Sequence, residues 1–132
     1  MKLVLAAVLL AAGVAFTGCA GGQGSERTVE LTVHHSRFSV DELHVRPGET
    51  IRFVLRNTDP IPHALIVGDQ SVQDIHELGT ESHHGERPGE VSVAPGSTAV
   101  TTYRFGRAGR LLFGCHLPGH WDYGMRGTIT VG

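Results

Sequence analysis

The 132-residue sequence has little of several features that would assign it at once to a common class of function. Its formal net charge is only −2, and it has no basic cluster interleaved with aromatic residues, which argues against a nucleic-acid-binding protein. Its longest apolar run, residues 3–16, is shorter than the roughly 20 residues that a membrane-spanning helix requires. The sequence also lacks internal repeats and long amphipathic helical patterns. What remains fits one small globular domain.

The short apolar run at the N-terminus indicates export. Lys2 precedes the run and small residues follow it, as in a secretory signal peptide. The segment Phe16-Thr17-Gly18-Cys19 resembles the lipobox of bacterial lipoproteins, in which the cysteine becomes the first mature residue and carries the lipid. We therefore predict a signal peptide over residues 1–18 and a lipid on Cys19. That lipid would anchor the protein to a membrane on its periplasmic or extracellular side. Ordinary secretion after cleavage nearby is the alternative.

Cysteine is scarce, and this scarcity makes Cys115 informative. Residues 19–27 are rich in glycine and are predicted to form a flexible tether, which leaves residues 28–132 as the folded domain. If Cys19 is lipidated, Cys115 is the single thiol of that domain. Because oxidising compartments favour disulfides, an unpaired cysteine in an exported protein needs a reason. Metal ligation is one such reason.

The sequence pattern of the domain predicts an all-β fold. Apolar and polar residues alternate over 29–33 and 51–55, as in half-buried strands. Pro-Gly turns at 47–48 and 95–96 separate short segments of this kind, which is typical of a sandwich or barrel. Residues 69–89 are the exception, since they are polar and contain several histidines. We expect no more than one helical turn there, over 74–78.

One motif near the C-terminus combines three metal-binding side chains at equal gaps. The spacing is Cys-x4-His-x4-Met, formed by Cys115, His120 and Met125. Cys115 follows a predicted strand, and the turn signal Pro118-Gly119 lets the chain bring His120 back towards it. A thiolate, two imidazoles and a weak thioether are the ligands that a trigonal electron-transfer copper site requires. The motif therefore supplies three of these four ligands, and only the second imidazole must come from elsewhere in the chain.

The most suitable further imidazole is that of His63. It stands at the head of an apolar strand pattern, 63–67, after the proline-flanked turn 60–62, whereas a histidine buried only for packing is the alternative reading. The other candidates for the missing imidazole are His34, His35, His44, His76, His83 and His84. We interpret the His83-His84 pair as part of a solvated loop, with a secondary surface metal site as the alternative. The His34-His35 pair is interpreted in the same way.

These motifs resemble those of the cupredoxins, the small blue copper proteins. The long ligand loop is similar to that of rusticyanin, auracyanin and sulfocyanin. The resemblance implies a Greek-key β-sandwich of seven to eight strands, with one type 1 copper on His63, Cys115, His120 and Met125. The chain departs from the family at Ala64, where many relatives have a hydrogen-bonding Asn or Ser. It also has an additional imidazole, His116, which we expect to point outward or to lie beside the ligands.

The expected function is electron transfer by copper cycling between Cu(II) and Cu(I), without an enzymatic reaction. Multicopper enzymes resemble two or three fused cupredoxin domains and contain His-x-His pairs, which this sequence lacks. A copper-binding protein for resistance or delivery is the alternative, favoured by the histidines of 69–89. Zinc suits the motif less well because its structural sites do not use Met. We expect a monomer that meets redox partners through an apolar rim around His120. The predicted rim consists of Ile61, Pro62, Leu117, Pro118, Trp121 and Tyr123.

Overall fold

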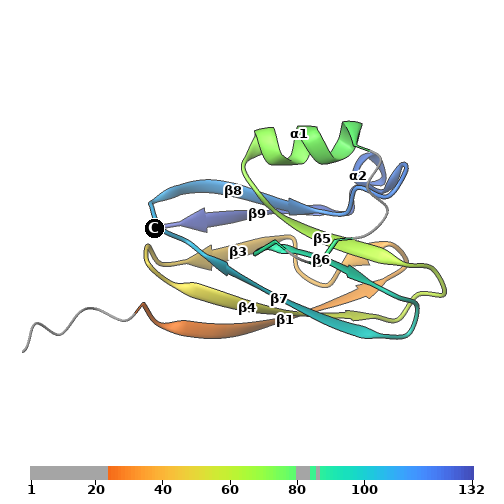
Figure 1. Ribbon diagram of the computed structural model, residues 1–132, viewed down its shortest axis with the longest axis horizontal. Helices are drawn as coiled ribbons and strands as arrows, with labels where there is room; N and C mark the ends of the chain where they lie inside the picture. Colours follow the sequence, from red (N-terminus) through yellow and green to blue (C-terminus); the bar gives the residue numbers. More distant parts are fainter. Residues whose placement is uncertain (1–23, 80–83, 86) are drawn as a thin grey trace, which may run out of the picture.

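A computed structural model describes residues 24–79, 84–85 and 87–132 (Figure 1). The predicted signal peptide, Cys19, most of the predicted tether and His83 lie outside the described residues. The strands are β1 (Glu26–His34), β2 (Arg37–Phe38), β3 (Glu42–Val45), β4 (Thr50–Asn57), β5 (His63–Gly68), β6 (Glu90–Val93), β7 (Thr98–Arg104), β8 (Gly109–Gly114) and β9 (Arg126–Val131). The helices are α1 (Gln70–Leu78) and α2 (His120–Tyr123).

The strands form a sandwich of two sheets, as the sequence predicts. One sheet has the order β2-β1-β4-β7 and the other β3-β9-β8-β5-β6. Nine strands occur in the described part of the chain instead of seven to eight, because the two-residue β2 has no sequence pattern of its own. The first strand begins at Glu26, three residues before the alternating pattern of 29–33. Glu26 and Arg27 continue the parallel register of β1 with β4, opposite Thr50 and Ile51.

The core lies between the two sheets, where the alternating strands direct their apolar side chains. The side chains that are wholly excluded from solvent include Leu31, Phe53, Leu55, Phe113 and Ile129. Burying one such side chain contributes about 1.5–3 kcal/mol through the hydrophobic effect. The strands are thereby held in fixed positions, and the loops at each end of the sandwich inherit that rigidity.

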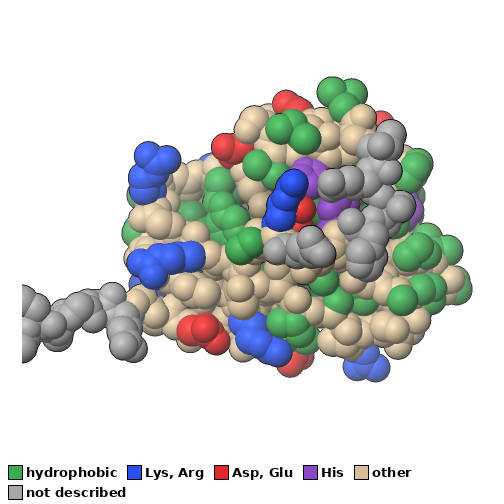
Figure 2. Space-filling view, viewed as in Figure 1, with side chains coloured by type: hydrophobic (Ala, Val, Ile, Leu, Met, Phe, Trp, Pro, Cys, Tyr) green, Lys and Arg blue, Asp and Glu red, His purple; other side chains and the backbone are tan. Residues whose placement is uncertain are grey.

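Helix α1 covers the outer face of β5, and this explains why all six residues of β5 are buried. The helix packs on β5 and β8 and lies above their sheet in Figure 1. It is longer than the single turn expected from the sequence. Its packing face carries Gln73, whose amide donates hydrogen bonds to the carbonyl oxygens of Ile66, Gly68 and Leu112, while Ile75 and Leu78 are exposed. Apolar periodicity is therefore a poor guide to this helix. In the view of Figure 2, histidine side chains gather beneath it.

The ends of the described chain and the candidate ligand loop lie at opposite ends of the sandwich. The described chain begins, and β9 ends, at the end opposite α2 and the β4–β5 loop (Figure 1). Among the described residues, neither helix has the length and apolar character needed to cross a bilayer.

An ion pair between the partly exposed Arg27 and the buried Glu49 joins β1 to the turn before β4. Glu49 is 3% exposed, and it accepts hydrogen bonds from Arg27 Nε at 2.9 Å and from the Arg46 N–H at 2.8 Å. These two bonds, that of Arg27 first, hold the pKa of Glu49 below its ordinary value of 4.5. The folded state thus keeps this carboxylate charged at a lower pH than the unfolded state does. The resulting stabilisation is complete above pH 4.5 and is lost as the pH falls through the lowered pKa.

We therefore expect Glu49→Gln to lower the free energy of unfolding by about 1–3 kcal/mol at pH 7. The difference from the wild type should shrink as the pH falls below the ordinary value, because the wild-type carboxyl group then becomes neutral as well. Urea denaturation across this pH range measures the effect. Glu42→Gln, at a 60% exposed side chain, is the control and should change stability little at any pH. A Glu49→Gln deficit that stays constant down to the acid limit would contradict the assignment.

Candidate metal centre

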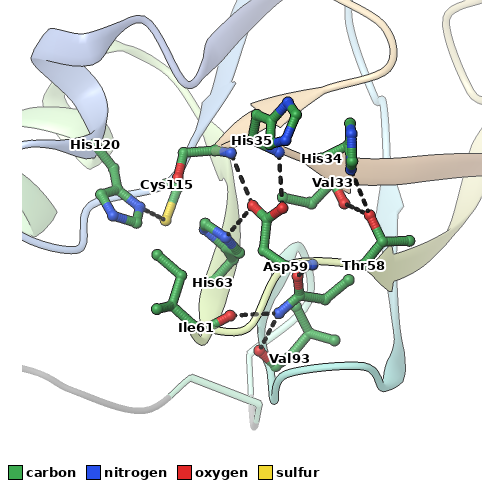
Figure 3. Close-up of polar contacts among 12 residues, drawn as sticks. Val33, His34, His35, Thr58, Asp59, Ile61, His63, Val93, Cys115 and His120 are labelled. Carbon is green, nitrogen blue, oxygen red and sulfur yellow. Dashed lines mark hydrogen bonds and ion pairs between the residues drawn. The ribbon is translucent and has the colours of Figure 1, made fainter.

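Three of the four predicted ligands converge at the α2 end of the sandwich (Figure 3). His63 opens β5, whereas Cys115 and His120 belong to the loop between β8 and β9. Cys115 Sγ lies 3.4 Å from His120 Nδ1, and the ring centroids of His63 and His120 are 5.0 Å apart. One nitrogen of each imidazole and the sulfur all lie within 4.8 Å of one another. The structure therefore brings together two imidazoles and a thiol from segments far apart in the sequence.

Met125 is the last residue of the same connection, immediately before β9. The Cys115 N–H donates to the Met125 carbonyl oxygen, and the Met125 N–H donates to that of His120, each at 3.0 Å. The Met125 side chain is fully buried in the same core cluster as Cys115. These bonds fix the methionine backbone beside both other ligand candidates of the loop.

Two glycines allow the ligand loop to fold back on itself. Gly119 precedes α2 with φ 78°, and Gly124 follows it with φ 99°, a left-handed conformation that residues with a Cβ rarely adopt. The turn at Pro118-Gly119 is the one that the sequence predicts. Because the chain reverses at both glycines, His120 and Met125 return to the position of Cys115.

Asp59 orients the His63 ring, a role that the sequence analysis missed. Its carboxylate lies 2.9 Å from His63 Nε2 and accepts the N–H groups of His35 and Ser36 at 2.7 and 2.8 Å (Figure 3). Burial alone would raise the pKa of Asp59, but the hydrogen bonds of Ser36, His35 and His63 outweigh it and lower the pKa. The charged carboxylate can only accept, so His63 Nε2 carries the ring proton.

This proton assignment leaves His63 Nδ1 with a lone pair. The atom is buried and has no hydrogen-bond partner among the residues that the structure describes. A buried polar atom without a partner normally costs about 1–3 kcal/mol, so its presence calls for an explanation. A metal bound beside Cys115 and His120 provides that explanation. The His63 arrangement, with its second nitrogen held by a carboxylate, is the usual one for a metal-binding histidine.

Asn57 supports the loop that carries Asp59 and His63. Its amide donates to the carbonyl oxygen of Ile61 at 2.7 Å, and its side-chain oxygen accepts the Asp59 N–H at 2.9 Å. It is 1% exposed, at the end of β4. The His63 side of the site is thus fixed by buried hydrogen bonds before any metal binds.

The backbone of Ala64 contributes to the environment of Cys115. Although alanine has no polar side chain, its backbone N–H donates to Cys115 Sγ at 3.3 Å. Burial raises the pKa of the Cys115 thiol, and the N–H groups of Leu117 and Ala64 oppose this only partly. Burial also lowers the pKa of His63 and of His120, which favours neutral rings with lone pairs. A buried thiol next to neutral imidazoles suits a soft or borderline metal cation that can hold the sulfur as thiolate.

His116 points towards α1 and is not outward-facing, which corrects one of the two expectations for it. Its nitrogens lie 2.7 Å from Glu77 Oε2 and 2.7 Å from Gln73 Oε1, and its side chain is 3% exposed. The ring stacks on Trp121 at a centroid distance of 4.7 Å. His116 therefore joins the ligand loop to α1, beside the ligands.

A two-sheet sandwich with His, Cys, His and Met gathered at one end defines a small copper protein of the cupredoxin class. Residues 25–132 match the model of the copper-binding proteins of the plastocyanin/azurin family. The chain belongs to this family, and copper is its cofactor. The predictions of a cupredoxin-like sandwich and of copper as the cofactor are thus confirmed.

Individual relatives share a third or less of their aligned residues with this chain. The chain is 33% identical over 112 residues to the copper-resistant cuproprotein CopI of Rubrivivax gelatinosus, covering 81% of this chain and 67% of the relative. It is 29% identical over 151 residues to the protein of the same name from Pseudomonas aeruginosa, covering 90% of this chain and 83% of that relative. Among solved structures, auracyanin of Roseiflexus castenholzii superposes with a TM-score of 0.68 at 21% identity, over 83% of this chain and 99% of that one. The last similarity establishes the fold.

We expect Asp59→Asn to weaken copper binding by about 10- to 100-fold, the usual effect of removing a carboxylate that orients a metal-bound histidine. The asparagine amide cannot accept all the bonds that Asp59 accepts, so the His63 ring loses its fixed orientation. Competition with a copper chelator measures the change. Asp122→Asn is the control, since Asp122 is exposed within α2, and it should bind copper like the wild type. Equal copper affinity in wild type and Asp59→Asn would show that Asp59 does not position His63.

Proposed function

We propose that one copper ion binds to His63 Nδ1, Cys115, His120 and Met125, and that the protein transfers electrons by cycling this ion between Cu(II) and Cu(I). The observation that carries the proposal is the lone pair of His63 Nδ1, buried without a partner beside the Cys115–His120 pair. Two imidazoles, one thiolate and a weak thioether suit both oxidation states of copper. A site held rigidly by Asp59 and the ligand loop would change little when an electron arrives, and this favours rapid transfer.

The entry point for the electron in this proposal is the edge of His120, the half-buried ligand. Apolar surface comes from the β4–β5 and β8–β9 connections, through Pro62, Pro118, Ile61 (42% exposed) and Tyr123 (56% exposed). Leu117 and Trp121 of the predicted rim are only partly exposed. We propose that this rim contacts redox proteins in transient encounters, which typically bury little surface, and that the protein acts as a monomer.

We also propose that the protein is exported and held at a membrane surface by a lipid on Cys19. In the described domain, the N-terminal end of β1 lies opposite the copper end (Figure 1). An anchor attached there would leave His120 directed away from the membrane and accessible to partners. Metabolic labelling with a fatty acid tests the anchor, because the wild type should take up label and Cys19→Ala should not.

Copper handling is the second candidate, favoured by relatives that are named copper-resistant cuproproteins. A stopped-flow experiment separates the two functions. An electron carrier should be reduced and reoxidised rapidly and should keep its copper when a Cu(I) chelator is present throughout. Slow electron exchange with loss of copper to the chelator in each reduction cycle would favour the handling role instead.

A further inference from the structure

A second group of metal-binding side chains lies between α1 and β6. His76 comes from α1, His84 from the segment before β6, and Glu90 is the first residue of β6. One ligand atom of each residue lies within 4.8 Å of those of the other two. We propose that these three residues form a second metal site, which binds a divalent transition-metal ion and prefers Cu(II) to Zn(II). The site is separate from the one assigned to electron transfer and does not depend on it.

The distances already suit a bound ion. His76 Nε2 lies 3.4 Å from Glu90 Oε1, and His84 Nδ1 lies 3.5 Å from Glu90 Oε2. The ring centroids of the two histidines are 5.1 Å apart. An ion bound at about 2.0–2.1 Å to tetrahedrally placed nitrogen and oxygen atoms holds these atoms about 3.3–3.4 Å apart. Small side-chain movements are therefore enough to complete the coordination.

Hydrogen bonding of His76 directs a lone pair into this cluster. His76 Nδ1 lies 2.7 Å from the carbonyl oxygen of Val72, which only accepts, so Nδ1 carries a proton. In the neutral ring, Nε2 then presents a lone pair to the Glu90 carboxylate. Two acceptors facing each other at 3.4 Å repel unless a cation, either a second ring proton or a metal ion, lies between them. The arrangement of these acceptors therefore favours a cation within the cluster.

His84 is held in place by its backbone, and Glu90 by its antiparallel pairing with Ile66 of β5. The His84 N–H donates to Ser92 Oγ, and the Ser92 N–H donates to the His84 carbonyl oxygen, both at 2.7 Å. The histidine and glutamate side chains are only 7% and 11% exposed. This burial corrects the interpretation of His84 as part of a solvated loop. Arg87 Nη1 also reaches Glu90 Oε1, at 4.0 Å, but this arginine is 69% exposed and can move away when a metal ion binds.

The kinds of ligand atom in this second site determine which metal ion it prefers. Two imidazoles and a carboxylate, with no sulfur, suit Zn(II) and Cu(II) and do not suit Cu(I). At a given site of this kind the affinity for Cu(II) exceeds that for Zn(II). Three protein ligands leave a coordination position open for water or for an incoming ligand. The centroid of the His76 ring lies 5.9 Å from that of His116, the residue after Cys115, so the second site adjoins the ligand loop.

The test is a titration of the mature protein that already contains one equivalent of Cu(II). A second equivalent of CuCl2 should give a second spin-resonance signal, with the wide hyperfine splitting of nitrogen- and oxygen-bound copper and no gain in intense colour. Calorimetry with ZnCl2, on protein that contains one equivalent of Cu(II), should show that one zinc ion binds more weakly than the second copper ion does. Glu90→Gln and His76→Gln should each weaken the second binding event at least tenfold in Kd while the first site keeps its colour. That retained colour shows that the variants are folded.

His44→Gln is the matched control. His44 also faces a carboxylate, that of Glu42 at 3.5 Å, but both side chains are exposed, at 74% and 60%, and the second binding event should be unchanged. Cys115→Ser should lose the first site and still bind the second ion, which separates this inference from the proposed function. A wild type that stops at one copper and binds no zinc would overturn the second site. So would a second binding event that survives unchanged in both Glu90→Gln and His76→Gln.

Discussion

Cys115→Ser is expected to abolish the intense visible absorption of the copper-loaded protein. In our account the colour arises from charge transfer from the Cys115 thiolate to Cu(II), and a serine hydroxyl does not supply such a transition. The buried thiol lies 3.4 Å from His120 Nδ1 and accepts the Ala64 N–H, so the change replaces the sulfur at the centre of the candidate site. Absorption spectra of wild type and variant at equal copper loading measure the effect.

The control uses the other cysteine of the chain. Cys19 precedes the segment that matches the copper-binding family, residues 25–132, so Cys19→Ser should keep the colour in full. A coloured Cys115→Ser protein would mean that another group supplies the charge transfer, and the ligand assignment would then be wrong.

Met125→Leu is expected to keep the colour and to raise the reduction potential by tens of millivolts. A thioether is a weak axial donor that stabilises Cu(II) relative to Cu(I), and leucine removes that donor while filling a similar volume. For a one-electron couple, about 59 mV corresponds to a tenfold change in the equilibrium constant. Redox titration followed through the visible band gives the potential directly.

Ile129→Leu is a comparable conservative change at a fully buried position of β9. It should leave the potential close to the wild-type value. If Met125→Leu leaves the potential unchanged as well, the methionine is a packing residue and not a ligand.

The three candidate ligands of the loop can be identified from the sequence because a single short segment contains them. Cys115, His120 and Met125 are separated by equal gaps with turn signals between them, so local geometry alone brings them together. His63 could be selected because it opens a strand whose apolar run is continuous. That run in turn reflects burial on both faces of β5, by the core and by α1.

The supporting residues could not be predicted because they depend on contacts between distant segments. Asp59 is charged and fixed because the turn after β1 presents the N–H groups of His35 and Ser36, both in left-handed conformations with φ 51° and 52°. The parallel pairing of β1 with β4 brings that turn beside Asp59, and no local pattern in the sequence reveals it.

The histidines of residues 69–89 likewise depend on contacts that the sequence does not reveal. The sequence suggests a polar connection with a short helical turn, because the buried face of α1 uses the amide of Gln73 in place of an apolar stripe. Once α1 packs on β5 and β8, His76 comes close to His84 and Glu90. The cluster is therefore a product of the tertiary fold, and counting histidines could not have identified it.

The most direct test of the copper centre is a visible and spin-resonance spectrum of the protein loaded with one equivalent of Cu(II). We predict a strong thiolate-to-copper band together with a narrow parallel hyperfine splitting, the signature of copper bound covalently to the Cys115 sulfur. Weak absorption with a wide splitting, as from copper held only by nitrogen and oxygen atoms, would contradict the account.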